Sequence, residues 1–159
     1  MGSAIFVLGF VAAIGSGLVA GTFFAFSSFV MAALGRLPSD HGMAAMNAIN
    51  VTVINPAFML AFFGTAVVCL MLSAASFLWW AGPAATLVPV ASAIYLVGCI
   101  GVTMAFNVPL NNALAGAPPG TPKAAALWSR YLADWTAWNT VRTVASALSA
   151  ILFTLALLL

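Results

Sequence analysis

Four long apolar segments constrain the fold of this chain more than any other feature of its sequence. They cover residues 4–34, 51–80, 84–106 and 135–159. Each is long enough to cross a bilayer, because a helix spans the ~30 Å hydrocarbon core with about 20 mostly apolar residues. The sequence lacks the alternating segments of a β-barrel, so helices must satisfy the backbone hydrogen bonds within the membrane. We therefore predict an all-α fold, in which residues 1–159 form a single antiparallel bundle of four transmembrane helices.

The composition indicates a lipid environment and argues against nucleic-acid binding. Hydrophobic residues make up 65% of the chain and charged residues only 4%, whereas about a quarter of the residues in a soluble domain are charged. The lipid bilayer is therefore the main partner that we expect. The sequence has no cluster of basic residues, so nucleic-acid binding is not expected. Cys69 and Cys99 lie in apolar segments without a CxxC pattern, and we interpret both as buried, inert thiols.

The first apolar segment is interpreted as a retained transmembrane helix. It lacks a basic region before it and is about twice as long as the apolar core of a signal peptide. Within it, Gly17 and Gly21 form a small-xxx-small pattern, which allows helices to approach closely. We expect this pattern to serve packing inside the bundle.

Several helix ends carry local signals. Ser39 is a candidate N-cap for a helix that starts before the membrane, and Pro56 then predicts a kink in that second helix. Thr121 followed by Pro122 has the pattern of an N-cap and a proline at the first helical position. A helix from Pro122 to Leu159 would be ~57 Å long. Its first half should therefore extend beyond the hydrocarbon core.

The end of the third helix decides whether three polar residues share one face. Proline opposes the continuation of a helix, so the third helix is expected to stop at residues 107–109. Thr103, Asn107 and Asn111 are spaced four residues apart and would share a face only if the helix continued through Asn111.

The loops predict an orientation in the membrane. Four spans place both termini on one side and the loops of residues 35–50 and 107–134 on the other. The loop cations Arg36, Lys123 and Arg130 all lie on this second side. By the positive-inside rule these two loops face the cytoplasm. We expect an integral membrane protein, located in the plasma (inner) membrane if the source is bacterial.

Strongly polar side chains gather near the loop end of the predicted bundle. The second segment carries them near its start, the third near its end and the fourth near its start. Polar residues at membrane depth are costly, which makes them functional candidates. We predict one polar cavity that opens from the loop side. Its candidate residues are Asn47, Asn50, Thr103, Asn107, Asn111, Asp134, Asn139 and Arg142.

Aromatic residues form a stripe on the fourth helix that ends at Arg142. Trp128, Tyr131, Trp135 and Trp138 recur at three- and four-residue spacing, which places them on one side of a helix. Trp138 lies one turn from Arg142, within reach of a cation–π contact.

Each of these residues also has a purely structural interpretation. Arg142 could extend to lipid headgroups, and Asp134 could pair with Arg130 at the surface. Asparagine side chains often join transmembrane helices, and an aromatic stripe is typical of a membrane interface. His41, beside Asp40, is expected to be solvated. A single histidine and two acidic residues in the whole chain predict no metal site.

Two motifs resemble the signature of a widespread family of small four-helix membrane proteins. The first is Asn-Val-Pro-Leu-Asn-Asn-Ala-Leu at 107–114, and the second is W-x-x-Y-x-x-x-W-T-x-W-N-x-x-R at 128–142. Gly-x-x-x-Gly-Thr at 17–22, Asn-x-x-Asn at 47–50 and Asn-Pro at 55–56 also match the family pattern. The family, long a domain of unknown function, includes the fungal anthrone oxygenases of polyketide pathways. The resemblance covers essentially the whole chain.

The resemblance implies oxidation of an anthrone to an anthraquinone by molecular oxygen without flavin, haem or metal. Such a reaction needs a base, donors for an enolate oxygen and aromatic walls for a flat substrate. Asp134 or His41 is the expected base. The expected donors are Asn107, Asn139 and Arg142, and the expected substrate-binding residues are Trp135, Trp138, Tyr131, Asn50, Asn47, Asn111 and Thr103.

No cofactor is predicted, and molecular oxygen is the expected co-substrate. The sequence has no GxGxxG, histidine pair or CxxCH pattern, but it leaves a bound haem or quinone open, and a homo-oligomer as well. Two further classes of function remain. The polar cavity could bind or transport a small lipophilic or anionic ligand, or the polar cluster could only fix helix packing in a structural subunit.

Overall fold

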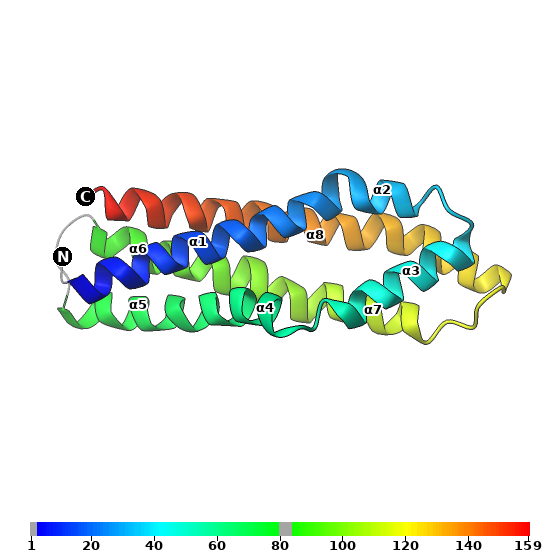
Figure 1. The fold of residues 1–159 in the computed structure, drawn as a ribbon, viewed down its shortest axis with the longest axis horizontal. Coiled ribbons are helices and arrows are strands. Elements are labelled where there is room, and N and C mark those ends of the chain that lie inside the picture. The colour runs from blue at the N-terminus through cyan, green and yellow to red at the C-terminus, as the bar shows by residue number, and fades with distance from the viewer. Residues whose placement is uncertain (1–2, 80–83) are drawn as a thin grey trace.

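The structure is a computed structural model that describes residues 3–79 and 84–159. Four of its helices are long and apolar enough to cross a membrane: Ala4–Leu34, Pro56–Ser76, Thr86–Ala115 and Pro122–Leu157. They run side by side with alternating direction, and the start of the first helix lies at the same end of the bundle as the end of the fourth (Figure 1). The prediction of an all-α, four-helix transmembrane bundle is confirmed, and the chain is an integral membrane protein.

Most of these long helices consist of α-helical and π-helical pieces. The first contains α1 (Ser3–Ala25), η1 (Phe26–Val30) and α2 (Met31–Leu34). The second contains α4 (Pro56–Met59), η2 (Leu60–Gly64) and α5 (Thr65–Trp79), and α3 (Ser39–Thr52) precedes it as an extension that we count with this helix. The third contains α6 (Ala84–Tyr95), η3 (Leu96–Gly101), η4 (Thr103–Asn107) and α7 (Val108–Ala115). The fourth is the single helix α8 (Pro122–Leu157).

The caps of α8 and α3 differ in how well the sequence predicts them. Thr121 caps α8 as expected, since its Oγ1 accepts a hydrogen bond from the backbone N–H of Ala124 at 3.1 Å. The expected cap at Ser39 is wrong. Ser39 is already the first residue of α3, and the extended residue before it, Pro38, occupies the N-cap position without a side-chain bond.

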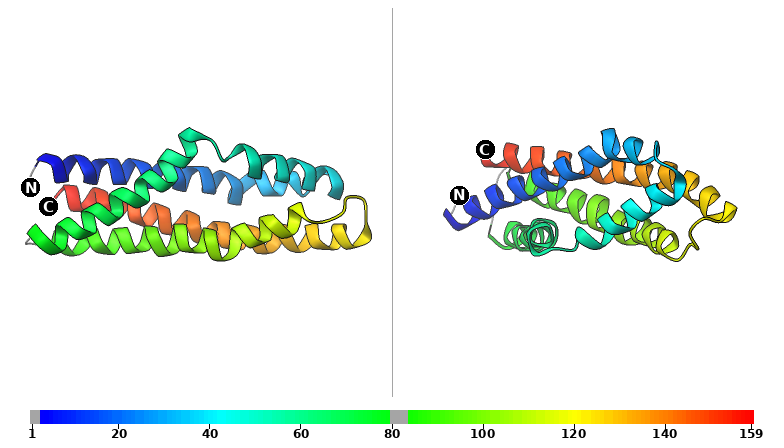
Figure 2. Two further views of the ribbon diagram at one scale, coloured as in Figure 1. Left: turned by 90° about the horizontal axis from the view of Figure 1, so that it is seen from below. Right: turned by 45° about the vertical axis from the view of Figure 1, so that its right-hand side comes forward.

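The second helix is interrupted at Val53–Asn55, where only a kink was expected. The side-chain Oδ1 of Asn55 accepts from the backbone N–H of Phe58 at 3.0 Å, and its Nδ2 donates to the carbonyl of Thr52 at 3.0 Å. Pro56 then occupies the first turn of α4, where a helix needs no N–H donor from it. The break is stable because Asn55 satisfies the backbone groups on both of its sides. It carries the second helix away from its neighbours around α4 (Figure 2).

The third helix continues past Pro109 to Ala115, so the expected stop at residues 107–109 is wrong. The π-helical segment η4 ends at Asn107, directly before the new α-helical segment. Pro109 therefore falls in the first turn of α7, where its missing N–H is tolerated. Thr103 and Asn111 consequently belong to one continuous helix.

Two hydrophobic clusters form the core, one in each half of the bundle. The cluster near the chain termini is rich in small residues, among them Ala12, Ala66 and Ala91. The cluster near the loops is built from methionines and aromatic residues around Trp128, and α3, α7 and α8 all contribute to it. At ~1.5 Å per residue α8 is about 54 Å long, so its first part extends beyond a ~30 Å hydrocarbon core.

Gly17 and Gly21 do not pack inside the bundle, which corrects the expectation from their spacing. A Cβ added to either residue would meet no atom within 4 Å. The inward face of α1 instead consists of residues such as Ala12, Ser16 and Val19, which are buried. Because these residues recur at helical spacing, the two glycines fall on the outer face.

Candidate functional site

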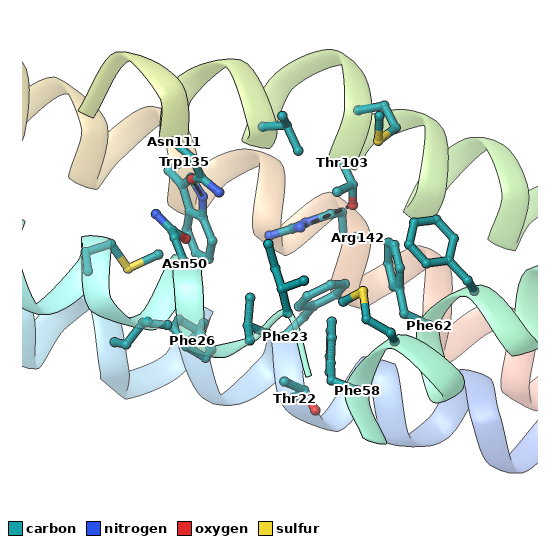
Figure 3. Close-up of a pocket in the computed structure, with 18 residues that line it drawn as sticks. Thr22, Phe23, Phe26, Asn50, Phe58, Phe62, Thr103, Asn111, Trp135 and Arg142 are labelled. Atoms are coloured by element: carbon teal, nitrogen blue, oxygen red, sulfur yellow. Dashed lines mark hydrogen bonds between the residues drawn. The ribbon is translucent and has the colours of Figure 1, made fainter. Parts of the chain in front are cut away.

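A cavity of about 200 Å³ lies between the helices at the level of the break in the second helix. All four long helices contribute to its wall (Figure 3). The wall is mostly apolar and aromatic, with a few polar side chains. The residues that line it are Thr22, Phe23, Phe26, Met46, Ile49, Asn50, Val53, Ile54, Phe58, Met59, Phe62, Phe63, Thr103, Met104, Val108, Asn111, Trp135 and Arg142.

Among the described residues that line the cavity, Arg142 alone is charged, and it is 4% exposed. Its Nη1 donates to Thr103 Oγ1 at 3.2 Å, and its Nη2 donates to Asn139 Oδ1 at 2.7 Å. The guanidinium carbon lies 4.0 Å from the ring centroid of Phe23 and 5.1 Å from that of Trp135. The cation is thus held between two hydrogen-bond acceptors and two aromatic rings, and Figure 3 shows it reaching toward Thr103.

No carboxylate neutralises this cation. Both acidic residues of the chain, Asp40 and Asp134, are exposed. Within the described ranges 3–79 and 84–159, the one ion pair closer than 4.0 Å joins His41 to Asp40. Burying an ion costs several kcal/mol, and hydrogen bonds and ring contacts offset only part of that cost. The arrangement therefore leaves the cavity with a positive potential that favours an anion.

Asn139 fixes the orientation of Arg142. Its Oδ1 accepts from the guanidinium, while its Nδ2 donates to the carbonyl of Phe23 and to Ser27 Oγ, both at 2.7 Å. Asn139 is fully buried and connects α8 to the first helix directly beside η1. Both the side chain of Arg142 and the ring of Phe23 below it are therefore attached to one rigid support.

Asn111 organises the other polar part of the cavity. Its Oδ1 accepts two hydrogen bonds of 2.8 Å, one from Tyr131 Oη and one from Trp135 Nε1. Asn107, one turn earlier, donates from Nδ2 to the carbonyl of Trp135 at 3.2 Å. These bonds tie α7 to α8 and hold the indole of Trp135 in place as a wall.

In the part of the chain that the structure describes, two buried donors on cavity-lining residues have no hydrogen-bond partner. They are Arg142 Nε and Asn50 Nδ2. An unpaired buried donor costs about 1–3 kcal/mol, so native proteins seldom retain one without a reason. Both donors belong to residues at the polar part of the cavity, where Figure 3 places Asn50 near Asn111 and Trp135. Together with the unneutralised charge, they suit a ligand that carries oxygen acceptors.

The structure brings some of the residues expected from the sequence to the cavity and places others behind its wall. Those that line it are Asn50, Thr103, Asn111, Trp135 and Arg142. Asn107, Tyr131 and Asn139 are buried and bond to lining residues or their backbone, but are not among the lining residues. They act as supports, which differs from the expectation that Asn107 and Asn139 line the cavity.

Four expected site residues lie apart from the cavity. Asp134 and His41 are exposed, since neither belongs to the buried face of its helix. Trp138 stacks on Phe106 with ring centroids 3.6 Å apart, so the expected cation–π contact with Arg142 is wrong. Asn47 does not line the cavity, although its Oδ1 is buried without a partner.

Sequence reasoning missed the aromatic wall contributed by the first two helices. Phe23, Phe26, Phe58 and Phe62 line the cavity, and Phe58 stacks on Phe62 with centroids 5.7 Å apart. In a segment that is apolar on every side, these residues do not stand out from their neighbours. Their one signal was the density of phenylalanine on either side of the Asn-Pro break.

Cys69 and Cys99 are free and buried, as the sequence predicted. Among the described residues, no group of three or more His, Cys, Asp or Glu side chains lies close enough to hold a metal ion.

Comparison with known proteins gives one match. A family model described as "Anthrone oxygenase" matches residues 58–152, which is more than half of the chain. The matched part begins just after the break in the second helix and includes Thr103, Asn111, Trp135 and Arg142. No curated protein and no solved structure matches the chain.

Proposed function

This chain belongs to the anthrone oxygenase family, and from that premise we propose that it is a membrane-embedded oxygenase. Its substrate is a flat, lipophilic, phenolic or anthrone-like molecule, which it oxidises with molecular oxygen and without a cofactor of its own.

The observation that carries this proposal is the buried cation in an aromatic cavity. Arg142 is 4% exposed, has no carboxylate partner, and lies against the rings of Phe23 and Trp135. A flat anion with its charge on oxygen complements this site in charge and shape. An enolate or phenolate of a fused-ring compound has both properties. Fixed donors that face a developing oxyanion typically accelerate such reactions by ~10²–10³-fold.

The proposed reaction needs no redox group from the protein. Loss of a proton from the methylene group of an anthrone gives an electron-rich enolate. The enolate transfers one electron to oxygen, and the resulting carbon radical and superoxide combine to form a C–O bond. Protonation gives a hydroperoxide, which loses water across its C–H and O–O bonds. One anthrone and one O₂ thus yield one quinone and one water.

The proposed role of Arg142 is to favour the ionised substrate. In the part of the chain that the structure describes, no Asp, Glu, His or Lys lines the cavity. Since the wall supplies no base, the proton of the substrate passes to water. The cation of Arg142 then stabilises the enolate that remains. Asn50 supplies a second donor to the substrate oxygens, and Trp135 and the phenylalanines enclose the rings.

A binding module is the alternative that the same observation favours. A protein that only holds or transports a lipophilic anion would need the cation and the aromatic walls, but no access for oxygen. Binding without turnover would identify it.

Oxygen consumption by the purified protein tests the proposal. The protein is stripped of metal, reconstituted in lipid nanodiscs and supplied with dihydroxyanthrone. Empty nanodiscs correct for spontaneous oxidation. We expect oxygen uptake above this background, with one O₂ consumed for each quinone formed. Saturable binding at the background rate would support the binding module instead. Absence of both binding and turnover would contradict either function.

We further propose that the loops of residues 35–50 and 107–134 face the cytoplasm, across the inner membrane if the source is bacterial. The support is that Arg36, Lys123 and Arg130 all lie on this side. Reporter fusions at Leu159 and within residues 115–120 test the orientation. A fusion at Leu159 that is active only in the cytoplasm would reverse it.

A further inference from the structure

Part of the cavity wall is apolar and reaches the outer surface of the bundle. Of the residues in its wall, three are also exposed on the outside of the bundle: Ile54 (71%), Met104 (58%) and Phe63 (47%). Side chains that both line a cavity and reach the outer surface mark the place where it opens. We call these three residues the mouth. It lies between the second and third helices, where Val53–Asn55 interrupt the second helix.

The depth of the mouth places it at the edge of the hydrocarbon core. At ~1.5 Å per residue, about 24 Å separate Phe63 from Trp79, and about 27 Å separate Met104 from Thr86. The end of α5 and the start of α6 both lie at the end of the bundle where α1 begins (Figure 1). A hydrocarbon core of ~30 Å that starts there reaches Phe63 and Met104 of the mouth. The mouth therefore opens among lipid acyl chains, close to the headgroups on the loop side.

The polar side chains of the wall are buried or half-buried, in contrast to the three residues of the mouth. Arg142 and Trp135 are buried, whereas the exposed wall residues are Ile54, Phe63 and Met104. A ligand that enters from the membrane would thus place its charged end inward and its apolar end outward.

The size of the cavity limits what it encloses. Its volume of about 200 Å³ is below the ~300–1,000 Å³ of pockets that bury most of a drug-sized ligand. A ring system fills it, and a long substituent has no room inside. The mouth leads from the cavity to an apolar environment.

We propose that the substrate is a tailed amphiphile: a phenolic ring system lies in the cavity, and a long apolar chain passes through the mouth into the bilayer. This inference rests on the proposed function for the position of the ring and extends it to the substrate class. The apolar tail of the substrate is surrounded by lipid both before and after binding, so it adds no free-energy cost to binding. The protein therefore selects its substrate from the membrane.

Two coloured, oxygen-stable probes test this inference on the full chain in nanodiscs. One is dihydroxyanthraquinone, and the other is the same ring system with a decyl chain on an outer ring. Affinities are expressed relative to the concentration of the probe in the membrane, so that differences in partitioning between water and lipid cancel. Met104→Trp and Ile54→Trp narrow the mouth. Val97→Trp and Leu60→Trp are the matched controls, since Val97 and Leu60 are 71% and 75% exposed and do not line the cavity.

In the wild type we expect the two probes to bind with similar affinity, because the decyl chain of the tailed probe extends into the lipid. Met104→Trp should weaken the tailed probe at least about tenfold more than the tail-free probe, because a built-in clash discriminates between ligands. Ile54→Trp should act in the same direction, and the controls should leave the ratio of the two affinities at its wild-type value.

Three results would overturn the inference. A tailed probe that fails to bind the wild type would show a closed ring pocket, with the proposed function intact. Equal weakening of both probes by both mouth variants would show that the ring itself fills the mouth. Failure of both probes to bind the wild type would remove the ring site, and the proposed function with it.

Discussion

The two halves of this bundle lie in the same membrane and are packed differently. Near the chain termini, the core combines small residues such as Ala12, Ala66 and Ala91 with large ones such as Tyr95 and Phe153. Near the loops, the core consists of large side chains that include Met46 and Trp128. We refer to these as the terminal half and the loop half.

The polar residues of the two halves differ in the same way. In the terminal half they are small hydroxyls such as Ser149, which donates to the carbonyl of Ala91 at 2.9 Å and lies 3.4 Å from Ser16 Oγ. In the loop half they are Asn and Arg side chains with unpaired donors beside a cavity. Small residues let helices approach until little space is left, whereas large ones beside a broken helix leave a void. The terminal half thus provides stability, and the loop half provides a binding site.

Arg142→Met should separate stability from activity most strongly. Turnover of dihydroxyanthrone should fall by ~10²–10³-fold, since the main donor to the oxyanion is lost. The thermal unfolding temperature should stay close to the wild-type value or rise, because replacing a buried ion by an apolar residue is often neutral or stabilising. Oxygen uptake and thermal unfolding in nanodiscs measure the two effects.

Two further variants calibrate that result. Arg142→Lys keeps the charge but loses the planar fork that reaches Thr103 and Asn139, so its turnover should lie between those of Arg142→Met and the wild type. Arg130→Met removes an exposed cation of the same helix and should leave turnover unchanged. Full turnover by Arg142→Met would assign the buried cation to structure alone.

The difference between the halves also explains how far the sequence predicted the molecule. Four apolar segments determine the bundle, because bilayer thickness fixes helix length. The polar residues Asn50, Thr103, Asn111 and Arg142 stood out against an apolar background, and all four line the cavity.

The remaining features depend on small rotations along helices. Trp138 precedes the buried Asn139 by one residue of the regular helix α8, which is enough to turn it from the buried face toward Phe106 of the π-helical segment η4. Pro109 indicated a stop because sequence alone does not reveal the π-helical turn η4 before it. Phe23 and Phe62 lie in uniformly apolar segments, where no pattern separates a wall residue from a lipid-facing one.

Ala91→Leu should damage the terminal half without changing the site. Ala91 is completely buried between helices, so the larger side chain forces neighbouring groups apart. Overpacking of this kind costs about 1–3 kcal/mol, measured as a lower unfolding temperature. Turnover per folded molecule should match the wild type. The adjacent Val90→Leu, on a side chain that is 49% exposed, should change neither quantity. A loss of turnover in a folded Ala91→Leu variant would show that the halves are coupled.

Asn50→Ala should weaken ligand binding with little effect on the fold. Loss of one hydrogen bond to a charged ligand costs about 1.5–3 kcal/mol, which is roughly tenfold or more in affinity. The unfolding temperature should not fall, because Asn50 Nδ2 has no partner in the free protein. Asn47→Ala, one turn away and outside the cavity, is the matched control. Equal affinities of the two variants for dihydroxyanthraquinone would exclude Asn50 as a ligand donor.

Asp134→Asn should have the smallest effect of all, and it decides between two mechanisms. Sequence reasoning made Asp134 one of two expected bases, and removal of a base that acts in the rate-limiting step costs ~10²–10⁴-fold in rate. Asp134 is exposed and absent from the cavity wall, so we expect turnover within about twofold of the wild type, as for most surface substitutions. His41→Asn, equally exposed, should behave in the same way. If both variants keep their rate while Arg142→Met loses it, the substrate ionises under the influence of the cation alone. If Asp134→Asn loses most of the rate and stays folded, a carboxylate outside the cavity takes the proton, and the loop half must rearrange during turnover to bring it there.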